Sequence, residues 1–203
     1  MTLTLTDRLN LILPHITSKA FLSSEGIGNE IACYIFDYPA TDELQVRAHI
    51  AWMMERFTTH HKDLRVLHLD LFDVVVAHLE QRGLWAKVLQ MQQTREVPEV
   101  LNALRGPLTA EKLRDAIAAG YAPGDHDLVL LSGVGRVWPM MRAHGLLNCL
   151  HTVLAQTPLV MFYPGDFDGT TLKLFGRFAA STHSPGARHY YRAFPLIPRE
   201  SQP

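Results

Sequence analysis

The amino-acid sequence predicts an α/β protein built in three layers, with a mostly parallel sheet of about five strands and helices on both faces. Short apolar runs alternate along the chain with segments of helical spacing, which is typical of strands joined by helical crossovers. The runs are apolar at successive positions, which indicates strands covered on both faces. The chain has 203 residues, of which 47% are hydrophobic and 19% charged, and we expect a single domain over residues 1–203.

Five segments are the predicted strands, four of them buried and the last at an edge of the sheet. The edge position follows from Pro195 and Pro198, because proline cannot donate to a strand ladder. The predicted strands are Ile31–Phe36, Leu64–Leu69, Asp127–Leu131, Pro158–Tyr163 and Tyr190–Ile197.

Apolar residues at helical spacing fill the intervals between these runs. Residues 84–120 form a predicted helical insertion, in which Gly106-Pro107 separates a helix over Val97–Arg105 from another that starts near Thr109. Ser132–Arg136 is expected to be a tight loop and Pro164–Gly169 a turn. The other expected helices start at Thr6 (with Pro14 kinking or dividing it), cover 42–58 and 71–82, and run from Pro139 to Gln156. Asp70 or Asp73 is expected to open the helix over 71–82.

The residues after each strand decide whether a nucleotide site exists, because ligands of open α/β sheets bind outside the carboxyl ends of the strands. A phosphate-binding loop has the order Gly-x-x-x-x-Gly-Lys-Ser/Thr, but none of the lysines of this chain follows a glycine. After the first strand, Asp37 would repel a phosphate and Pro39 lacks an amide donor. The sequence therefore predicts a scaffold that resembles the P-loop type without its Walker A loop.

Gly133 and Gly135 lie between a strand and a helix, where a dinucleotide fingerprint would be found. The third small residue of that fingerprint is replaced by Trp138, which would prevent the close packing of helix and strand. One interpretation is a tight turn that needs a positive φ. The other is an anion site assisted by Arg136 and Arg142, whose guanidinium groups lie near a helix start.

Paired carboxylates and histidines are the remaining candidates for catalysis. Asp166 and Asp168 could hold magnesium in a nuclease, but their sequence also favours turn and capping roles. His144 and His151 are two helical turns apart, too far to share one ion without a further ligand between them. No Ser-His-Asp arrangement is visible, because Ser132 lacks the Gly-x-Ser-x-Gly elbow. We expect no metal, no cofactor and no enzymatic activity.

The charge balance argues against binding nucleic acid with the whole surface, because the net charge is -1. Acidic residues exceed basic ones before Leu130 and basic residues exceed acidic ones after it. This split is compatible with self-association. The N-terminus lacks the pattern of a signal peptide and no apolar run is long enough to span a membrane, so a cytoplasmic location is expected.

Aromatic and basic residues near the C-terminus could form a contact surface for a partner. Tyr190 and Arg192, together with Trp138, are of the types that dominate interaction hot spots. The alternative is that alternate residues of this strand only face the helices that cover the sheet.

Three ordered motifs carry a resemblance to a known family. They are Gly133–His144 (GVGRVWPMMRAH), Leu159–Gly169 (LVMFYPGDFDG) with Leu172–Gly176 (LKLFG) after it, and Tyr190–Phe194 (YYRAF). On these motifs the chain resembles, over nearly its whole length, the BrxB family of BREX bacteriophage-exclusion systems, formerly described as a domain of unknown function. The resemblance implies a role in phage defence. BREX operons pair a methyltransferase that marks host DNA with a phosphatase-like protein called PglZ, a large ATPase and further components.

The resemblance implies a non-catalytic adaptor that helps to assemble the BREX complex by binding the PglZ-like protein. It supplies no catalytic residues. We also expect a homodimer and no direct binding of nucleic acid or membrane. A degenerate nucleotide- or phosphate-binding regulator that uses the Gly133–Arg136 loop is the alternative, ahead of a metal-dependent nuclease. The expected partner- or anion-binding residues are Gly133, Gly135, Arg136, Arg142, Tyr190 and Arg192.

Overall fold

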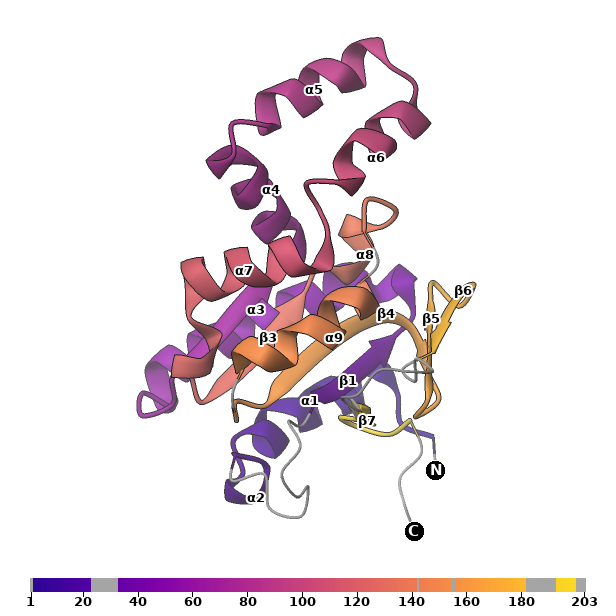
Figure 1. The fold of residues 1–203 in the computed structure, drawn as a ribbon. Coiled ribbons are helices and arrows are strands. Elements are labelled where there is room, and N and C mark those ends of the chain that lie inside the picture. The colour runs from indigo at the N-terminus through magenta and orange to yellow at the C-terminus, as the bar shows by residue number, and fades with distance from the viewer. Residues whose placement is uncertain (1, 23–32, 142, 155, 182–192, 200–203) are drawn as a thin grey trace.

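The computed structural model describes residues 2–22, 33–141, 143–154, 156–181 and 193–199. Five parallel strands lie in the order β2-β3-β4-β1-β7, while β5 pairs with β4 and β6 pairs with β5, both in antiparallel fashion. Helices flank the sheet (Figure 1), which confirms the predicted α/β class, while the further likeness to a P-loop scaffold stays a prediction. The strands are β1 (Cys33–Tyr38), β2 (Val66–Asp70), β3 (Leu128–Ser132), β4 (Leu159–Phe167), β5 (Thr171–Leu174), β6 (Phe178–Ser181) and β7 (Ala193–Pro195).

The helices follow the predicted segments closely between the second and third strands. The helix predicted over Val97–Arg105 has those bounds, and the next one is capped by Thr109. Among the described helices, none combines the length and apolar character that a membrane crossing requires. They are α1 (Leu5–Ile16), α2 (Lys19–Leu22), α3 (Glu43–His60), α4 (Leu71–Gln81), α5 (Trp85–Thr94), α6 (Val97–Arg105), α7 (Ala110–Tyr121), α8 (Val134–Val137) and α9 (Ala143–Leu154).

The strand order explains why helices lie on both faces. From β1 the chain crosses to β2 at the far end of the parallel strands and then returns one strand at a time through β3 to β4. Crossovers between parallel strands are right-handed, so connections that run in opposite directions place their helices on opposite faces. Hence α3 packs on one face with α1, whereas α4, α7 and α9 pack on the other (Figure 1).

The central strands β1, β3 and β4 are buried on both faces, as their continuous apolar sequences predict, whereas β2 at the edge is mostly half-buried. Along β3, Val129 and Leu131 pack under α4, α7 and α9, whereas Leu128 and Leu130 pack under α1 and α3. This alternation gives each face of the sheet its own apolar core.

Two helices of the predicted insertion extend away from the sheet (Figure 1). No residue of α5 is buried, and Leu104 is the buried residue of α6. Leu89 and Val97 are exposed on this pair. By contrast, α7 returns to the sheet and buries Leu113 and Ile117.

The turn predicted over Pro164–Gly169 is wrong in its first half, because β4 continues to Phe167 and pairs with β5. The Val129 N–H donates to the Pro158 carbonyl. Pro158 and every second residue after it, including Pro164, therefore direct their backbone hydrogen-bonding groups toward β3. Pairing with β3 stops at Met161, so the missing N–H of Pro164 breaks no ladder bond. Gly165 is required because a Cβ there would overlap the backbone of Lys173 on β5.

The tight loop predicted after the third strand is a single turn residue followed by a short helix. Gly133 has φ +76°, which confirms the predicted positive φ, but Gly135 and Arg136 belong to α8. Trp138 is extended because it precedes Pro139, so the helix predicted to start at Pro139 begins instead at Ala143.

At the N-terminus, the first helix begins one residue before the predicted start. Thr4 caps it, and Thr4 and Asp7 form a capping box. The helix continues through Pro14 to Ile16 and is not divided there. At the other end, the described part of the predicted last strand is β7, which lies at the edge beside β1 as expected.

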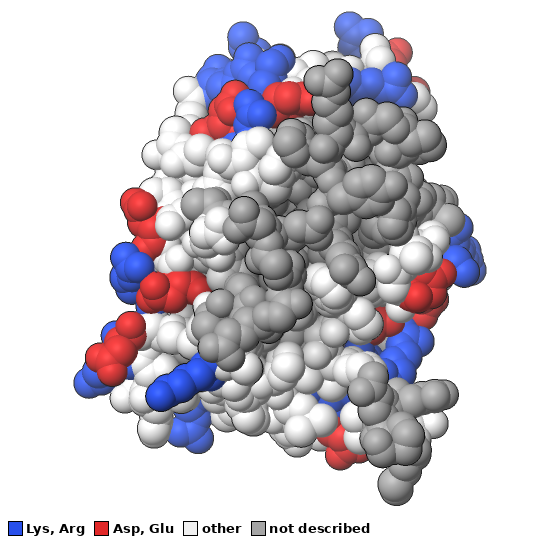
Figure 2. All heavy atoms as spheres, turned by 60° about the horizontal axis from the view of Figure 1, so that its bottom comes forward, with Lys and Arg blue, Asp and Glu red and all other residues white. Residues whose placement is uncertain are grey.

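Basic and acidic side chains lie next to one another on the face of the molecule that points downward in Figure 1. Figure 2 shows Lys and Arg side chains beside Asp and Glu side chains around the rim of this face, with uncharged residues among the described atoms at its centre. The separation of charge along the sequence therefore does not make this face uniformly basic or acidic.

Candidate functional site

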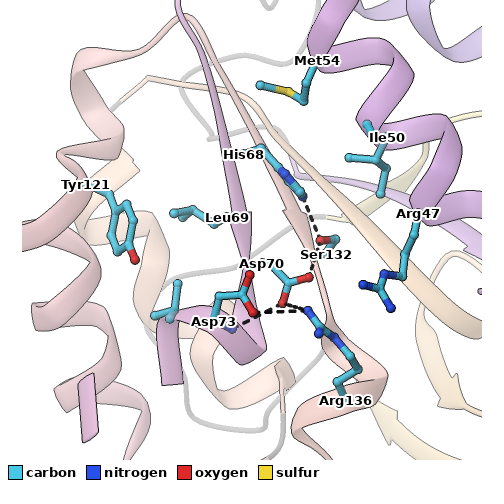
Figure 3. A pocket seen from close by; sticks show the side chains of 12 residues that line it. Arg47, Ile50, Met54, His68, Leu69, Asp70, Asp73, Tyr121, Ser132 and Arg136 are labelled. Atoms are coloured by element: carbon cyan, nitrogen blue, oxygen red, sulfur yellow. Dashed lines mark hydrogen bonds and ion pairs between the residues drawn. The ribbon is translucent and has the colours of Figure 1, made fainter. Parts of the chain in front are cut away.

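A pocket of about 720 Å³ lies beside β2. One wall is formed by α3 with Arg47, Ile50, Ala51 and Met54, and the other by α4 and by Tyr121 of α7. Side chains of β2 line the pocket between these walls, and Ser132 and Arg136 lie at one end (Figure 3).

Four polar side chains from β2, β3 and α8 form a connected chain in this pocket. His68 Nε2 lies 2.8 Å from Ser132 Oγ, and Ser132 Oγ donates to Asp70 Oδ2 at 3.3 Å. Arg136 pairs with Asp70 and lies 3.6 Å from an oxygen of Asp73 (Figure 3). The guanidinium of Arg136 also lies 5.1 Å from the centre of the Phe72 ring.

The sequence holds Asp70 in place through the local backbone. Asp70 is the last residue of β2 and the N-cap of α4, where its side chain accepts from the backbone N–H groups of Phe72 and Asp73 at 3.0 and 3.4 Å. This cap is the role predicted for Asp70 or Asp73. Across from it, a Cβ at Gly133 would overlap the Asp70 carboxylate. Glycine is therefore needed both for the positive φ and for the close approach of Asp70.

The environment shifts the protonation of both titratable groups that flank Ser132. Burial would raise the pKa of Asp70, but the Arg136 guanidinium and the two helix N–H groups together lower the pKa below its ordinary value. Burial lowers the pKa of His68, against the opposing effect of the Asp70 and Asp73 charges. At neutral pH the pair is thus a carboxylate and a neutral imidazole.

The order of these side chains differs from that of a hydrolase triad. In a Ser-His-Asp triad the histidine lies between the serine and the carboxylate and takes the serine proton. Here Ser132 lies between His68 and Asp70 and donates to Asp70. The tautomer of His68 that fits this network donates Nε2–H to Ser132. The sequence did not indicate that these three residues meet, and the structure brings them together with Ser132 between the imidazole and the carboxylate.

A second ion-pair network occupies the carboxyl ends of β1 and β4. The buried Arg8 pairs with Asp37 Oδ1 at 2.7 Å and donates to the carbonyls of Asp37 and Ile197. Arg199 pairs with Asp37 Oδ2 at 2.6 Å and with Asp166 at 2.8 Å. These contacts join α1 and the C-terminal segment to the end of the sheet.

The two carboxylates considered for magnesium have other partners. Asp168 Oδ1 accepts from Thr170 N and Oγ1 and from Thr171 N at 2.7–2.9 Å, which confirms its turn role. Asp166 lies within β4 and pairs with Arg199. Within the ranges that the structure describes, no three His, Cys, Asp or Glu side chains gather as metal ligands would.

Three of the six predicted site residues lie close together at the start of α8. Gly133 adjoins Asp70, and Gly135 lies against β4 and the residue after β5, where a Cβ would come 3.0 Å from Pro164 Cγ and 3.1 Å from Phe175 Cε1. The charge of Arg136 is directed to Asp70 and Asp73. Arg142, Tyr190 and Arg192 lie outside the described residues.

Sequence reasoning missed most of the two polar networks. The signal for His68, Asp70 and Ser132 was present, because Asp70 and Ser132 each come directly after a predicted parallel strand and such strand ends meet at one edge of a sheet. Arg8 and Arg199 gave no comparable signal, since Arg8 bonds to a carbonyl 189 positions away.

Comparison with known proteins gives one consistent result. Residues 67–196 match the family model described as "BREX protein BrxB". A protein of that name from Bacillus cereus strain H3081.97 is 39% identical over 193 residues, which cover 94% of this chain and 96% of the relative. Another of the same name, from Escherichia coli O9:H4 strain HS, is 37% identical over 191 residues, covering 94% and 90% respectively. No solved structure matches the chain.

Proposed function

The chain belongs to the BrxB family of BREX proteins, and we propose that within a BREX system it acts as a non-catalytic adaptor that binds the PglZ-like protein. The family places the chain in a phage-defence system together with other BREX components. Binding of one of those components, without turnover of a substrate, is the role that the chemistry of the strand ends supports best.

The observation that carries this proposal is how the chain fills the carboxyl ends of its own sheet. At β2 and β3, the Asp70 carboxylate lies against Gly133 and pairs with Arg136. At β1 and β4, Asp37 pairs with both Arg8 and Arg199. The positions where an α/β protein binds phosphate thus hold carboxylates that the chain neutralises itself. Ion pairs of this kind stabilise a surface for docking and leave little free charge for an anionic substrate.

We place the partner contact at the start of α8 and the residues after it. Trp138 is 36% exposed there and packs edge-on against Phe175 at 6.0 Å. Tryptophan and arginine are the residue types that contribute most to interaction hot spots. This surface includes the predicted Arg136. Arg142, Tyr190 and Arg192 stay predicted contact residues, since they lie outside the described residues.

Co-elution of this chain with the PglZ-like protein of the same operon tests the proposal. The two full-length proteins are mixed at micromolar concentrations and separated by size exclusion, and we expect one shared peak. Trp138→Ala is expected to weaken the affinity by about tenfold or more, whereas Trp52→Ala, at a tryptophan 41% exposed on α3, leaves it unchanged. Separate elution of the two wild-type proteins would refute the adaptor role.

A thermal-shift measurement separates the adaptor from the nucleotide-binding alternative. A ligand at 100 times its dissociation constant stabilises the folded state by about 2.7 kcal/mol. The adaptor proposal predicts no shift of the melting temperature with nucleotides, with or without magnesium. A clear shift that Arg136→Ala removes would favour the regulator instead.

A further inference from the structure

We propose that the free edge of β2 binds an extended peptide segment of a partner as an additional strand of the sheet. The proposal deepens the adaptor function by naming the element of the partner that is recognised. It concerns the pocket beside β2, whose walls are α3 on one side and α4 with α7 on the other.

The pocket is a groove along the second half of β2, from His68 to Asp70. Its lining comes from both faces of the sheet, since Ile50 belongs to the core under α3 and Val74 to the core under α4 and α7. It also follows the strand, because Arg47 and Asp70 lie toward the carboxyl end, whereas Tyr121 lies beside Leu69 (Figure 3). A cavity that touches both faces of the sheet alongside His68 and Leu69 follows the outer edge of β2 there.

That edge presents backbone hydrogen-bonding groups without a strand partner among the described residues. There β2 pairs with β3 and with no other strand. The Asp127 N–H donates to the Arg65 carbonyl, so Arg65 and every second residue after it direct their backbone N–H and C=O groups toward β3. Val66 and His68 therefore point their N–H and C=O groups toward the free edge, and those of His68 face the groove. Such a row of groups is a template for another strand.

The walls of the groove favour a single extended segment over a second copy of this chain. Pairing brings strands to about 4.8 Å from one another. In a dimer formed through two β2 edges, α3 and α7 of each copy would meet the same walls of the other copy before the strands could approach. A peptide has no such walls, and five residues at about 3.4 Å each match the length of β2.

The charge and polarity of the walls define the segment. Ile50, Ala51 and Met54 make one wall largely apolar, and Val74 and Tyr121 supply apolar surface on the other. Arg47 extends toward the end with Ser132 and Arg136 (Figure 3) and has no ion-pair partner in the described part of the chain. The groove thus fits a segment with apolar side chains facing both walls and an aspartate or glutamate opposite Arg47.

Selection from a library of random displayed peptides tests this inference directly. The probe is the peptide library, and the target is the immobilised full-length chain. We expect the selected peptides to share a stretch of about five residues rich in strand-forming apolar side chains, with an acidic residue at one end. Failure to select any peptide would overturn the proposal.

Substitutions in the groove then locate the binding site. Ala51→Trp fills the groove from the exposed side of α3, and Val66→Pro removes one N–H from the free edge while leaving the bonds to β3. Each is expected to weaken binding of a selected peptide by about tenfold or more, as is Arg47→Glu for the acidic residue. The matched control Ala86→Trp, at an exposed position of α5, is expected to bind as wild type does. Equal binding by Ala51→Trp and wild type would overturn the proposal even if Val66→Pro does not fold.

The same variants separate this inference from the adaptor function. If the PglZ-like protein co-elutes with wild type and equally with all three groove variants, the groove is not its docking site and the inference fails while the adaptor role stands. If peptides bind in the groove but no BREX component co-elutes with wild type, the peptide-binding inference is supported and the adaptor role is refuted. A dimer of the free chain that Ala51→Trp dissociates would show that a second copy occupies the edge.

Discussion

Gly133 is the residue on which the geometry of the pocket beside β2 most depends. Its φ of +76° disfavours any side chain, and the Asp70 carboxylate lies where a Cβ would be. Gly83 also has a positive φ, +64°, but nothing lies within 4 Å of a Cβ added there. A substitution at Gly83 therefore measures the cost of the backbone conformation without a steric clash.

Gly133→Ala is therefore expected to destabilise the protein more than Gly83→Ala. The backbone cost is about 1–2 kcal/mol at each site, and Gly133→Ala must also displace Asp70 from Arg136, which adds about 1–3 kcal/mol. Denaturant unfolding of both variants measures the difference. Equal losses at the two glycines would show that Asp70 does not lie against Gly133.

Three histidines with lowered pKa values make the stability of the protein depend on pH below neutrality. Burial lowers the pKa of His68, and likewise of His15 and His49, from the ordinary value of 6.5. A lowered pKa means that the unfolded chain binds protons that the folded state does not. The free energy of unfolding is thus expected to keep its full value above about pH 6.5 and to fall as the pH drops through the window beneath it.

His68→Gln is expected to make this decline shallower, because Gln can still donate to Ser132 but does not titrate. The exposed His60→Gln serves as the control and should leave the slope as in wild type. Unfolding curves between pH 7 and pH 5 give the comparison. A slope that His68→Gln leaves unchanged would place His68 in contact with solvent.

At the scale of elements, the Arg8 network ties α1 and the C-terminal segment to β1. The side chains of Arg8 and Asp37 are 4% and 8% exposed. Breaking a buried pair leaves a charge without its partner and costs about 3–5 kcal/mol. Arg199 also pairs with Asp37, so Asp37 keeps one partner when Arg8 is replaced and the lower end of that range applies.

We expect Arg8→Met to lower the free energy of unfolding by about 3 kcal/mol. The exposed pair Arg65–Asp127, with side chains 65% and 36% exposed, offers the control, since Arg65→Met should cost much less than Arg8→Met. Denaturant unfolding measures both. A loss for Arg8→Met no larger than that control would mean that the network does not hold α1 in place.

The sequence predicted the parallel strands well and the antiparallel hairpin not at all. Apolar runs such as Asp127–Leu131 place the buried strands within a few residues, because burial on both faces leaves a strong signal. The hairpin of β5 and β6 was missed because Pro164 and Gly165 resemble a turn. Pro164 is accommodated in β4 because pairing with β3 has already stopped, and Gly165 is needed because the backbone of β5 crosses there. The local sequence reveals neither of these tertiary contacts.

The candidate site was predictable only in part for the same reason. Gly133 and Asp70 are marked by their places at strand ends, so the turn and the cap could be predicted. Their contact, and the placement of His68 beside Ser132, depend on the register that sets Asp70 opposite Ser132 in neighbouring strands. Strand order and register are long-range properties, and the sequence left them open.

At the scale of the whole molecule, the expected homodimer stays a prediction. β7 lies at the opposite end of the parallel strands from β2, and an edge strand can pair across a two-fold axis. Light scattering coupled to size exclusion is expected to give twice the mass of the 22.9 kDa chain. A mass of one chain at micromolar concentrations would exclude a stable dimer.

The central claim is that the chain acts by binding a partner and not by chemistry at its polar pocket. Phage plating on cells that carry the complete BREX operon tests it most directly, with Ser132→Ala, His68→Gln or Trp138→Ala in this chain. The account predicts that Ser132→Ala and His68→Gln keep wild-type protection, while Trp138→Ala loses it. Loss of protection with Ser132→Ala, in a variant that folds and still assembles with its partners, would contradict the account.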